Sequence, residues 1–469
     1  MTSIPDEALA YLHAFPDFER GTAGEEILTL DRMRRLLELL GYPDGAYGIV
    51  HVVGTKGKGS TAAMIAACLR AAGYRIGLFT SPHLVDYRER IQVDGALIPP
   101  DALAVIVDEA LRPAVERLQA AGERTPLHFE LLCALAFEHF RRDAVRVAVV
   151  EAGLGGRLDA TNAVSRIVET VITTIGHDHM AVLGDTLDAI ATEKAAVVRP
   201  DGWVISAPQP REALAVVERV CRERGAQLTL IGREWRVEHI VTRADGTVFD
   251  LRGPGVRYDG LRVPLAGRHQ AINGAVAVAA LADLRRDYPQ LNETAIRRGL
   301  DMARWPGRLQ GVARDPLVIL DAAHNRESAA ALASALRDLY PGQLFVLVVA
   351  VLRDKDAADI LAPLVPLASH VVVAAADHPR ALPSADLAAV ARTLLGEGAS
   401  SPSHPDIGGP DAPAPGELVE EAPSVAAGLE RARALAGPDG RVLVTGSLRT
   451  VGEAMIQLKI DATSESQRQ

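Results

Sequence analysis

The amino-acid sequence predicts an α/β protein whose strands are mostly parallel. Short apolar runs that are typical of buried strands alternate with longer segments of helical pattern. The first series of such runs lies at residues 48–54, 75–81, 145–152, 169–176 and 203–208. Parallel strands need helical crossovers and are buried on both faces, so they read as continuous apolar runs rather than alternating ones. We therefore expect a large sheet with helices on both sides.

Residues 235–265 have a different pattern. Apolar and polar residues alternate with a period of two around Asp245-Gly246, which is typical of a small antiparallel meander. A helical stretch, HQAINGAVAVAALADLRRDY, follows at residues 269–288.

A second series of strands begins after the segment WPG at residues 305–307. Its apolar runs lie at residues 317–324, 344–352, 370–376 and 441–447. We place the domain boundary near residue 304, which gives one domain at 1–304 and a smaller α/β domain at 305–469. Within the second domain, residues 396–416 are dense in Gly, Pro, Ala and Ser, and this composition predicts a mobile surface insertion.

Composition and charge limit the class of protein. Of the 469 residues, 48% are apolar and 23% are charged, which is typical of an ordinary soluble globular enzyme. The net charge of −10 argues against bulk nucleic-acid binding, which needs a basic face. We expect no signal peptide, and the longest apolar run, LFVLVVAVL, is too short to span a bilayer. The three cysteines, Cys68, Cys133 and Cys221, lie far apart and form no Cys-x-x-Cys pair. We therefore expect neither a disulfide framework nor a zinc site. We expect the protein to lie in the cytoplasm.

The stretch HVVGTKGKGSTAAM at residues 51–64 predicts a phosphate-binding loop. It follows an apolar strand, contains three glycines and leads into a helix. Glycines let backbone N–H groups turn inward around a phosphate, and the helix N-terminus adds partial positive charge. The spacing differs from the common G-x-x-x-x-G-K-[ST] pattern, because Val52 stands where a glycine is expected. A glycine-rich turn with solvated lysines is the alternative. The residues expected at the nucleotide are Gly54, Thr55, Gly57, Lys58, Gly59, Ser60 and Thr61.

Three residues at or near the ends of expected strands are candidate Mg²⁺ ligands. Ser81 follows RIGLFT, Glu151 ends VRVAVV, and His179 follows VITTIG in an HDH cluster. Mg²⁺ prefers oxygen ligands, and the ligands of open α/β sheets gather at the carboxyl ends of strands. Each residue also has a structural alternative without a metal. Ser81 could be a turn residue before proline, Glu151 a helix N-cap acid, and His179 a buried histidine whose hydrogen bonds are satisfied.

Several motifs occur along the chain in an order that resembles one family. They are GTKGKGST, LFTSPHL, EAGLGGRLDATN, DHMAVLGDTLDAIATEKAAVVRP, RWPGRLQ, LDAAHN, DKD, DHPRAL and TGSLRTVGE. In this combination they resemble the folylpolyglutamate synthase/dihydrofolate synthase family, a branch of the Mur-ligase-like ATP-dependent amide ligases. The resemblance covers nearly the whole chain, and EAGLGGRLDATN with a later EKA is far more specific than the loop alone.

The resemblance implies a fold and a reaction. The fold is a P-loop-type, mostly parallel sheet domain that binds ATP and folate, followed by a smaller Rossmann-like α/β domain of the glutamate-ligase type. A folate carboxylate would attack the γ-phosphate of ATP, and the amine of L-glutamate would then attack the acyl phosphate and displace phosphate. The folate would be tetrahydrofolate, with dihydropteroate as a second candidate. The family is often monomeric, and we expect a monomer that binds neither nucleic acid nor membranes.

The resemblance also implies roles for residues of the first domain. Lys58 would contact the β- and γ-phosphates. Ser81 and Glu151 would hold one Mg²⁺, and His179 would join Glu151 at a second Mg²⁺. Lys194 stands in the EKA motif, where many members of the family carry a carbamylated lysine. The residues alone leave a second reading of Lys194 open, in which its ammonium pairs with a nearby carboxylate such as that of Glu193.

Further roles fall near and beyond the expected boundary. Arg308 would contact the phosphates, Asp321 and His324 would serve nucleotide and substrate, and Asn273 would lie beside the adenine. We expect the catalytic work to be shared by Lys58, His179, Lys194, Arg308, Asp321 and His324.

Two positions depart from the family's pattern. Lys56 replaces the asparagine of the usual GTNGKGS loop, and His177 replaces a leucine. The departure at His177 leaves the local apolar packing open.

Other functions stay open at this point. A cell-wall Mur ligase that adds an amino acid to a UDP-sugar would need a separate N-terminal UDP-binding domain, which we do not expect before residue 48. A guanine-nucleotide switch would need an Asn-Lys-x-Asp motif, and the sequence has none. A purely structural binding module would leave the triple-glycine loop unexplained.

Overall fold

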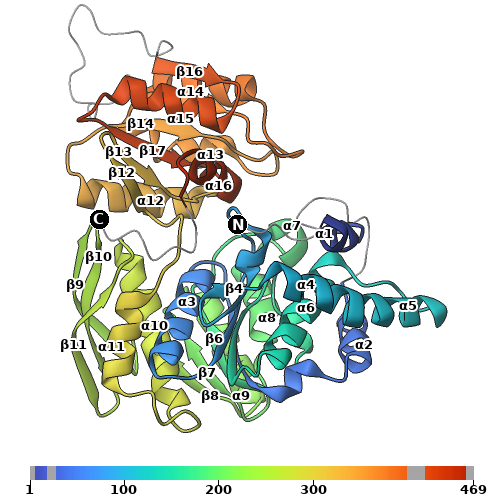
Figure 1. Cartoon of the computed structure of the whole chain (residues 1–469). Helices are drawn as coiled ribbons and strands as arrows, with labels where there is room; N and C mark the ends of the chain where they lie inside the picture. The colour runs from blue at the N-terminus through green and yellow to red at the C-terminus, as the bar shows by residue number, and fades with distance from the viewer. Residues whose placement is uncertain (1–5, 18–27, 399–417, 461–469) are drawn as a thin grey trace, which may run out of the picture.

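The computed structural model describes residues 6–17, 28–398 and 418–460. Figure 1 shows two α/β parts, a larger one drawn in blue to yellow and a smaller one drawn in orange to red. They are joined by the segment after α11 (Glu293–Met302). None of the helices in these described ranges is long and apolar enough to cross a membrane.

The larger part contains an eight-stranded sheet with the order β4-β3-β2-β5-β1-β6-β7-β8. From β2 to β8 in this order every neighbouring pair is parallel, as the apolar runs predict. β3 and β4 form an antiparallel hairpin that pairs with β2 at one edge of the sheet, and the sequence pattern did not predict it. The strands are β1 (Gly48–Val53), β2 (Ile76–Phe79), β3 (Ile91–Val93), β4 (Ala96–Leu97), β5 (Val147–Glu151), β6 (Ile167–Ile172), β7 (Trp203–Ser206) and β8 (Gln227–Leu230).

Helices cover both faces of this sheet because its strands are apolar on both sides. Val50 and Val52 of β1 join the core beneath α3, α10 and α11, whereas Ile49 joins the core beneath α1, α2 and α6. The helices of the larger part are α1 (Asp6–His13), α2 (Asp31–Leu39), α3 (Lys58–Ala71), α4 (Pro100–Ile106), α5 (Arg112–Ala120), α6 (His128–Arg142), α7 (Met180–Leu183), α8 (Leu187–Ala195), α9 (Arg211–Glu223), α10 (Arg268–Leu284) and α11.

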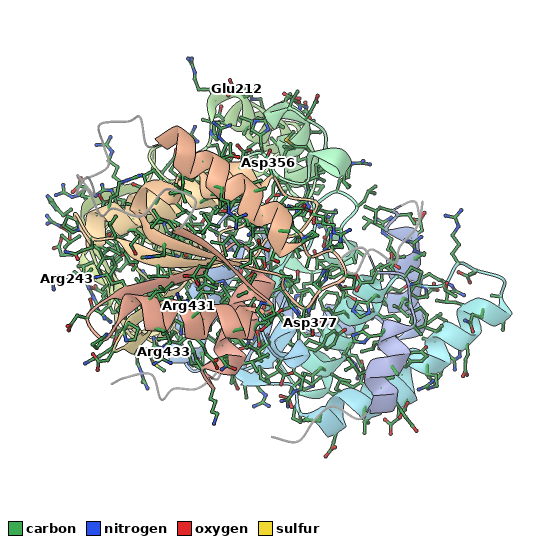
Figure 2. All side chains as sticks on the ribbon, turned by 90° about the horizontal axis from the view of Figure 1, so that it is seen from above. Glu212, Arg243, Asp356, Asp377, Arg431 and Arg433 are labelled. Atoms are coloured by element: carbon green, nitrogen blue, oxygen red, sulfur yellow. The ribbon has the colours of Figure 1, made fainter. Side chains whose placement is uncertain are left out.

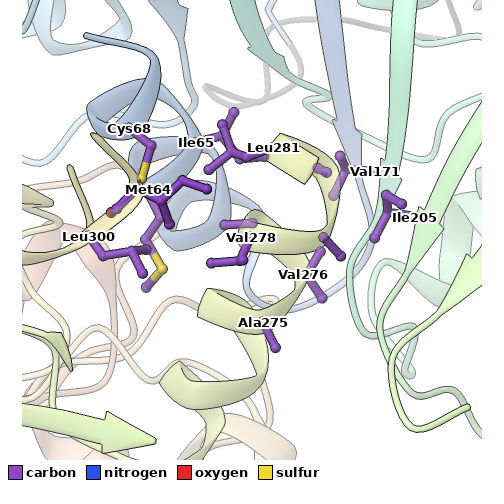
Figure 3. Packing of buried hydrophobic residues seen from close by; sticks show 14 of the residues in the cluster. Met64, Ile65, Cys68, Val171, Ile205, Ala275, Val276, Val278, Leu281 and Leu300 are labelled. Carbon is purple, nitrogen blue, oxygen red and sulfur yellow. Dashed lines mark hydrogen bonds between the residues drawn. The ribbon is translucent and has the colours of Figure 1, made fainter. Parts of the chain in front are cut away.

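A close approach between α3 and α11 fixes the position of α3. A Cβ atom at Gly299 would lie 2.3 Å from the Cα atom of Cys68, so only glycine fits there. The Cys68 thiol donates a hydrogen bond to the carbonyl oxygen of Ile296 at 3.4 Å. Figure 3 shows Met64 and Cys68 of α3 beside Leu300 of α11 and Val278 of α10. Because α3 begins at the phosphate loop, this packing also holds the loop in place.

The antiparallel meander predicted at residues 235–265 is confirmed. It consists of β9 (Arg236–Arg243), β10 (Gly246–Gly253) and β11 (Val256–Val263), in the order β11-β10-β9. Phe249, Leu251 and Leu261 are fully buried on its inner face and share a core with α10.

The smaller part contains a six-stranded sheet with the order β12-β13-β17-β14-β15-β16. Only β12 is antiparallel to its neighbour. Its elements are β12 (Gln310–Arg314), β13 (Leu317–Leu320), α12 (Arg326–Leu339), β14 (Phe345–Val349), α13 (Ala357–Leu361), β15 (Ala368–Ala374), α14 (Ser384–Gly398), β16 (Val419–Ala422), α15 (Val425–Ala436), β17 (Arg441–Thr445) and α16 (Leu448–Gln457). The mobile insertion predicted at 396–416 lies outside the described residues, except for the last residues of α14.

The outer surface of the smaller part is charged. Arg431 and Arg433 of α15 are exposed, while Leu429 and Ala432 of the same helix are buried against the sheet. Figure 2 shows Arg431 and Arg433 on this outer helix. The helix therefore has the two-sided pattern of a helix that covers a sheet.

Candidate active site

A cavity of about 1540 Å³ opens between the two parts of the molecule. Its lining includes most of the residues that the sequence predicts for the site: Thr55, Gly57, Lys58, Gly59, Ser60, Ser81, Glu151, His179, Asn273, Arg308, Asp321 and His324. Gly54, Thr61 and Lys194 are buried and do not line the cavity. The cavity therefore brings together predicted residues that are up to 269 positions apart, from Thr55 to His324, as 324 minus 55 gives.

The glycines of the phosphate loop are required by close packing. Gly54 and Gly57 have φ angles of +142° and +87°, which side chains rarely adopt. A Cβ atom at Gly54 would lie 2.0 Å from Thr173 Oγ1, and one at Gly57 would lie 2.4 Å from Asn273 Oδ1. The loop between β1 and α3 is thus held as bare backbone, which is the arrangement that lets amides surround a phosphate.

Two further residues contact this loop. Trp305 covers Gly59, where a Cβ atom would lie 2.1 Å from its ring. Asn273 of α10 lies beside Gly57, and its amide donates a hydrogen bond to Gln270 Oε1 at 3.0 Å. The adenine-side role of Asn273 stays a prediction, and the contact of Trp305 was not foreseen from the sequence.

Lys58, Ser81 and Glu151 meet at the mouth of the loop. Lys58 Nζ lies 4.0 Å from Glu151 Oε1, and the backbone amide of Ser81 donates a hydrogen bond to the Glu151 carboxylate. Burial raises the pKa of Glu151 to about 7, although the positive charges of Lys58 and Arg308 act against this rise. Among the described residues, Glu151 Oε2 is buried without a hydrogen-bond partner. An anionic oxygen so placed is under-compensated and suits a hard cation.

His179 lies at the start of α7 with a φ of +50°. Its Nε2 atom is 3.9 Å from Asp178 Oδ1, and 52% of its side chain is exposed. Although the side chain is half-exposed, partial desolvation lowers the pKa of His179, the Asp178 carboxylate raises it, and the cations Lys355 and Lys58 lower it further. In the described ranges no group of three His, Cys, Asp or Glu side chains could hold a metal by itself. A Mg²⁺ ion here would therefore draw on the Ser81 hydroxyl and on phosphate oxygens as well as Glu151 and His179.

Lys194 is buried on α8 behind the phosphate loop. Its Nζ atom donates a hydrogen bond to the carbonyl oxygen of Gly54 at 2.8 Å. Burial lowers the pKa of Lys194 to about 7, and the nearby Lys58 lowers it further. The neighbouring Glu193 is bound to Arg157 at 2.8 Å, so it is not the carboxylate that balances Lys194.

The smaller part contributes a turn held by Asp321. Asp321 Oδ2 accepts a hydrogen bond from the Leu309 amide at 2.8 Å, and Oδ1 accepts one from the Ala323 amide at 2.9 Å. Burial raises the pKa of Asp321, while Arg308 acts to lower it. The carboxylate of Asp321 therefore fixes the backbone next to Arg308, which faces the cavity.

His324 follows this turn. Its Nδ1 atom lies 2.8 Å from the carbonyl oxygen of Ala322, so Nδ1 carries the proton that this bond needs. Burial lowers the pKa of His324 to about 4. The ring is therefore neutral near pH 7, with Nε2 available as an acceptor.

An ion pair that the sequence did not predict lies on the wall of the cavity that the larger part forms. Lys56 Nζ lies 3.0 Å from Asp178 Oδ2. Asp178 also receives Lys355 Nζ at 3.7 Å and the Asn325 amide at 3.3 Å, both from the smaller part. Burial alone would raise the pKa of Asp178, but Lys56 and His179 hold it well below its usual value. The only sequence signal was the departure at Lys56 from the family's asparagine.

Comparison with known families assigns both parts of the molecule. The Mur ligase middle domain matches residues 52–281, and the Mur ligase glutamate ligase domain matches residues 307–448. Together with the phosphate loop and the cavity between the two parts, these matches define a Mur-type, ATP-dependent ligase.

Curated relatives narrow the class. The chain is 36% identical to the dihydrofolate synthase/folylpolyglutamate synthase of Mycobacterium tuberculosis, over 91% of this chain and 89% of that protein. It therefore belongs to the folylpolyglutamate synthase/dihydrofolate synthase family. The Bacillus subtilis protein of the same name is 35% identical, over 76% of this chain and 83% of its own. A probable bifunctional folylpolyglutamate synthase/dihydropteroate synthase of Haloferax volcanii is 38% identical over 90% of this chain, which spans only 48% of that longer protein.

Solved structures agree with this assignment. Folylpolyglutamate synthase of Mycobacterium tuberculosis, complexed with ADP and AMPPCP, has a TM-score of 0.83 and 32% identity, and the match covers 97% of this chain and 98% of that one. The Thermotoga maritima folylpolyglutamate synthase has a TM-score of 0.81 and 30% identity, with 97% and 98% covered. The predicted fold class is confirmed.

Proposed function

We propose that this ligase uses ATP to join L-glutamate to the carboxylate of a folate through an acyl phosphate. The observation that carries the proposal is the cavity in which Lys58 and Glu151 of the larger part face Arg308, Asp321 and His324 of the smaller part. Relatives named folylpolyglutamate synthase match this chain over most of its length, and the structure of one of them was solved in complex with ADP and AMPPCP. We also propose that residues 1–304 form the ATP- and folate-binding domain and residues 305–469 the glutamate-ligase domain.

The phosphate loop and its cations would serve the first step. Loop amides hold the phosphates, and Lys58 and Arg308 stabilise the charge on the oxygens of the transferring phosphoryl group. Phosphoryl transfer needs positioning and charge compensation more than covalent help from the protein. Ser81, Glu151 and His179 would hold two Mg²⁺ ions, which supply further positive charge at these oxygens when bound.

The second step is the attack of the glutamate amine on the acyl phosphate. The carbon–nitrogen bond forms as the carbon–oxygen bond to phosphate breaks, and the amine must lose a proton. The departing phosphate can take that proton. His324 Nε2 is a neutral hydrogen-bond acceptor that can orient the amine, because its Nδ1–H is held by a backbone carbonyl, whereas a pKa lowered to about 4 makes the ring too weak a base to keep the proton near pH 7. Asp321 would act on the same step by holding the turn that carries Arg308.

We propose that Lys194 is carbamylated in the active enzyme. A neutral amine attacks CO₂ to form a carbamate and releases a proton, which turns a cation into an anionic oxygen ligand. Its burial, its lowered pKa of about 7 and its position beside Lys58 favour the neutral amine that this reaction needs. The alternative is an unmodified lysine that keeps its bond to the Gly54 carbonyl.

Dihydropteroate is the second candidate acceptor. Relatives from Bacillus subtilis and Mycobacterium tuberculosis carry both activities in their names, and an Escherichia coli relative was solved in complex with DHPP and ADP. We propose a monomer of the cytoplasm whose partners are these small molecules, and neither nucleic acid nor membranes.

The test is ATP-dependent incorporation of labelled glutamate, with tetrahydrofolate and dihydropteroate as acceptors in parallel reactions. Phosphate release should require glutamate and an acceptor together. A protein that releases phosphate at the same rate without either substrate would be a nucleotide switch. Incorporation of an amino acid into a UDP-sugar would instead identify a cell-wall ligase.

A further inference from the structure

The ion pair between Lys56 and Asp178 joins three segments that are far apart in sequence. Lys56 lies in the phosphate loop, and Asp178 lies in the loop between β6 and α7. Asn325 at the start of α12 and Lys355 after β14 reach the same carboxylate from the smaller part. One carboxylate therefore connects the phosphate loop to the opposite wall of the cavity.

We propose that Lys56 is a positioning residue for ligation, which holds Asp178 where it docks the smaller part through Asn325 and Lys355 onto the phosphate loop. The side chains of Lys56 and Asp178 are 27% and 12% exposed, so solvent screens this pair less than a surface ion pair. Asparagine, the family's residue at this position, is shorter and has no charge to offer.

The backbone around Lys56 supports a structural task rather than a phosphate contact. The amides of Thr55 and Lys56 both donate to the carbonyl oxygen of Thr174, at 2.9 and 3.1 Å. The Thr55 hydroxyl bonds the Gly176 carbonyl at 3.1 Å. The start of the phosphate loop is thus tied to the segment that carries Asp178, and the Lys56 side chain adds a further contact to that segment. Lys58, two residues later, faces Glu151 instead.

A second contact beside the carboxylate links the same two walls. The His177 amide donates a hydrogen bond to Glu327 Oε1 at 3.2 Å. A Cβ atom at Gly176 would lie 2.5 Å from Glu327 Oε2, so the smaller part approaches the backbone closely there. The arrangement of Asp178 therefore matters to how the walls fit. Lys355 is shared between two carboxylates, because its Nζ atom lies 3.7 Å from Asp178 and 3.9 Å from Asp354. Lys56, at 3.0 Å, is therefore the closer of the two lysines to Asp178.

The position of the smaller part matters because an acyl phosphate is destroyed by water. When the smaller part is docked onto the larger part, the cavity excludes water and the set of charges around the reacting atoms is complete. Removal of the Lys56 charge should loosen this docking while leaving the phosphate loop able to bind nucleotide. Lys56 would then affect turnover more than nucleotide affinity. The catalytic readout of this inference rests on the proposed function.

The experiment compares Lys56→Asn, Lys56→Arg, Lys355→Met and the double variant Lys56→Asn/Lys355→Met. The control is Lys459→Met, because Lys459 is exposed beyond α16 and contacts no part of the cavity. Each variant is tested for ligation, for affinity toward a non-hydrolysable ATP analogue by calorimetry, and for radius of gyration by X-ray scattering.

We expect Lys56→Asn and Lys355→Met each to lower kcat about tenfold, because Lys355 pairs with Asp178 across the interface and Lys56 holds Asp178 in place for that contact. The affinity for the ATP analogue should change less than about twofold, and Lys56→Arg should keep most of the turnover. Because both lysines act through Asp178, the double variant should fall about as far as one single variant, not about a hundredfold. The radius of gyration of Lys56→Asn should exceed that of the wild type, while Lys459→Met should match it.

Three results would overturn the inference. Analogue binding weakened about tenfold by Lys56→Asn would make Lys56 a phosphate ligand. Multiplicative effects of the two lysines would show that Asp178 does not couple them. An unchanged radius of gyration would remove the docking role, and this measurement needs no turnover. If the wild type ligates no glutamate, the proposed function fails while the scattering comparison still decides the role of Lys56.

Discussion

Lys194 Nζ donates a 2.8 Å hydrogen bond to the Gly54 carbonyl, across 140 residues of sequence. This bond places a buried amine directly behind the phosphate loop. A second amine, that of Lys58, lies close enough to lower its pKa. Because two positive charges in one buried site repel each other, we expect Lys194 to be either neutral or modified.

The variant Lys194→Ala should lose ligation, and a small carboxylate such as acetate should restore part of it. Acetate can occupy the space of the lost carbamate and return its negative charge. Lys194→Arg should stay inactive, because guanidinium cannot form a carbamate. Rates measured with and without added acetate check this. High activity in Lys194→Arg would show that positive charge is what the site requires, and the carbamate would be ruled out.

Replacement of Lys58 by alanine should abolish ligation and leave the fold intact. A cation aimed at developing charge on the γ-phosphate is worth about 100-fold or more in rate, and the loop is not part of the core. Turnover and the unfolding temperature should be measured on the same preparation. A folded Lys58→Ala protein with near-normal turnover would remove the assignment of this loop to phosphate.

The variants Glu151→Gln and His179→Ala should each raise the Mg²⁺ concentration needed for half-maximal rate and lower turnover by at least about tenfold. The exposed Glu223 offers a matched control as Glu223→Gln, which should behave as wild type. Titration of the rate with Mg²⁺ at saturating ATP checks the prediction. A structure with Mg²⁺ and an ATP analogue in which neither side chain lies within about 2.5 Å of a metal would contradict it.

Glu169 makes a pH-dependent contribution to stability. It is fully buried in β6, its Oε1 atom has no partner among the described residues, and Arg286 reaches Oε2 only at 3.4 Å. Burial raises the pKa of Glu169 well above its usual value, followed by the effect of Asp283, which raises it further. Its contribution to stability is therefore present below the unfolded pKa and is lost as the pH rises toward the folded pKa.

Glu169→Gln should therefore be more stable relative to wild type at pH 8 than at pH 5. Between the unfolded and the folded pKa of Glu169, the free energy of unfolding of the variant relative to wild type should rise by about 1.4 kcal/mol for each pH unit. Denaturant unfolding at the two pH values checks this, with Glu116→Gln as an exposed control. Parallel pH curves for Glu169→Gln and wild type would refute the assignment.

The sequence predicted the interior strands well and the edge strands poorly. The runs that became β1, β5 and β14 are buried throughout, so they contain no polar interruption to obscure them. β12 (QGVAR) and β16 (VEEA) are half-polar because each lies at a sheet edge with one side near solvent. Neither run is apolar enough to be told from a loop by pattern alone.

The site was predicted where chain order and sheet geometry suffice. Lys58 follows β1 and Glu151 ends β5, and the carboxyl ends of such parallel strands meet at one edge. The link from Lys56 to Asp178, Lys355 and Asn325 depends on how two sheets dock. No periodicity encodes that orientation. Motif order could place these residues on the right loops but could not show that one carboxylate joins them.

Lysine is scarce in this protein, and its distribution has a practical consequence. The chain has five lysines, all in the described ranges, against 45 arginines, as 50 minus 5 gives. Lys56, Lys58 and Lys355 line the cavity, Lys194 is buried behind it, and only Lys459 lies elsewhere. An amine-selective acylating reagent would therefore act almost as a site-directed footprint. Bound nucleotide and substrate could be mapped by mass spectrometry on the unaltered enzyme, with Lys459 as the internal standard for reagent strength.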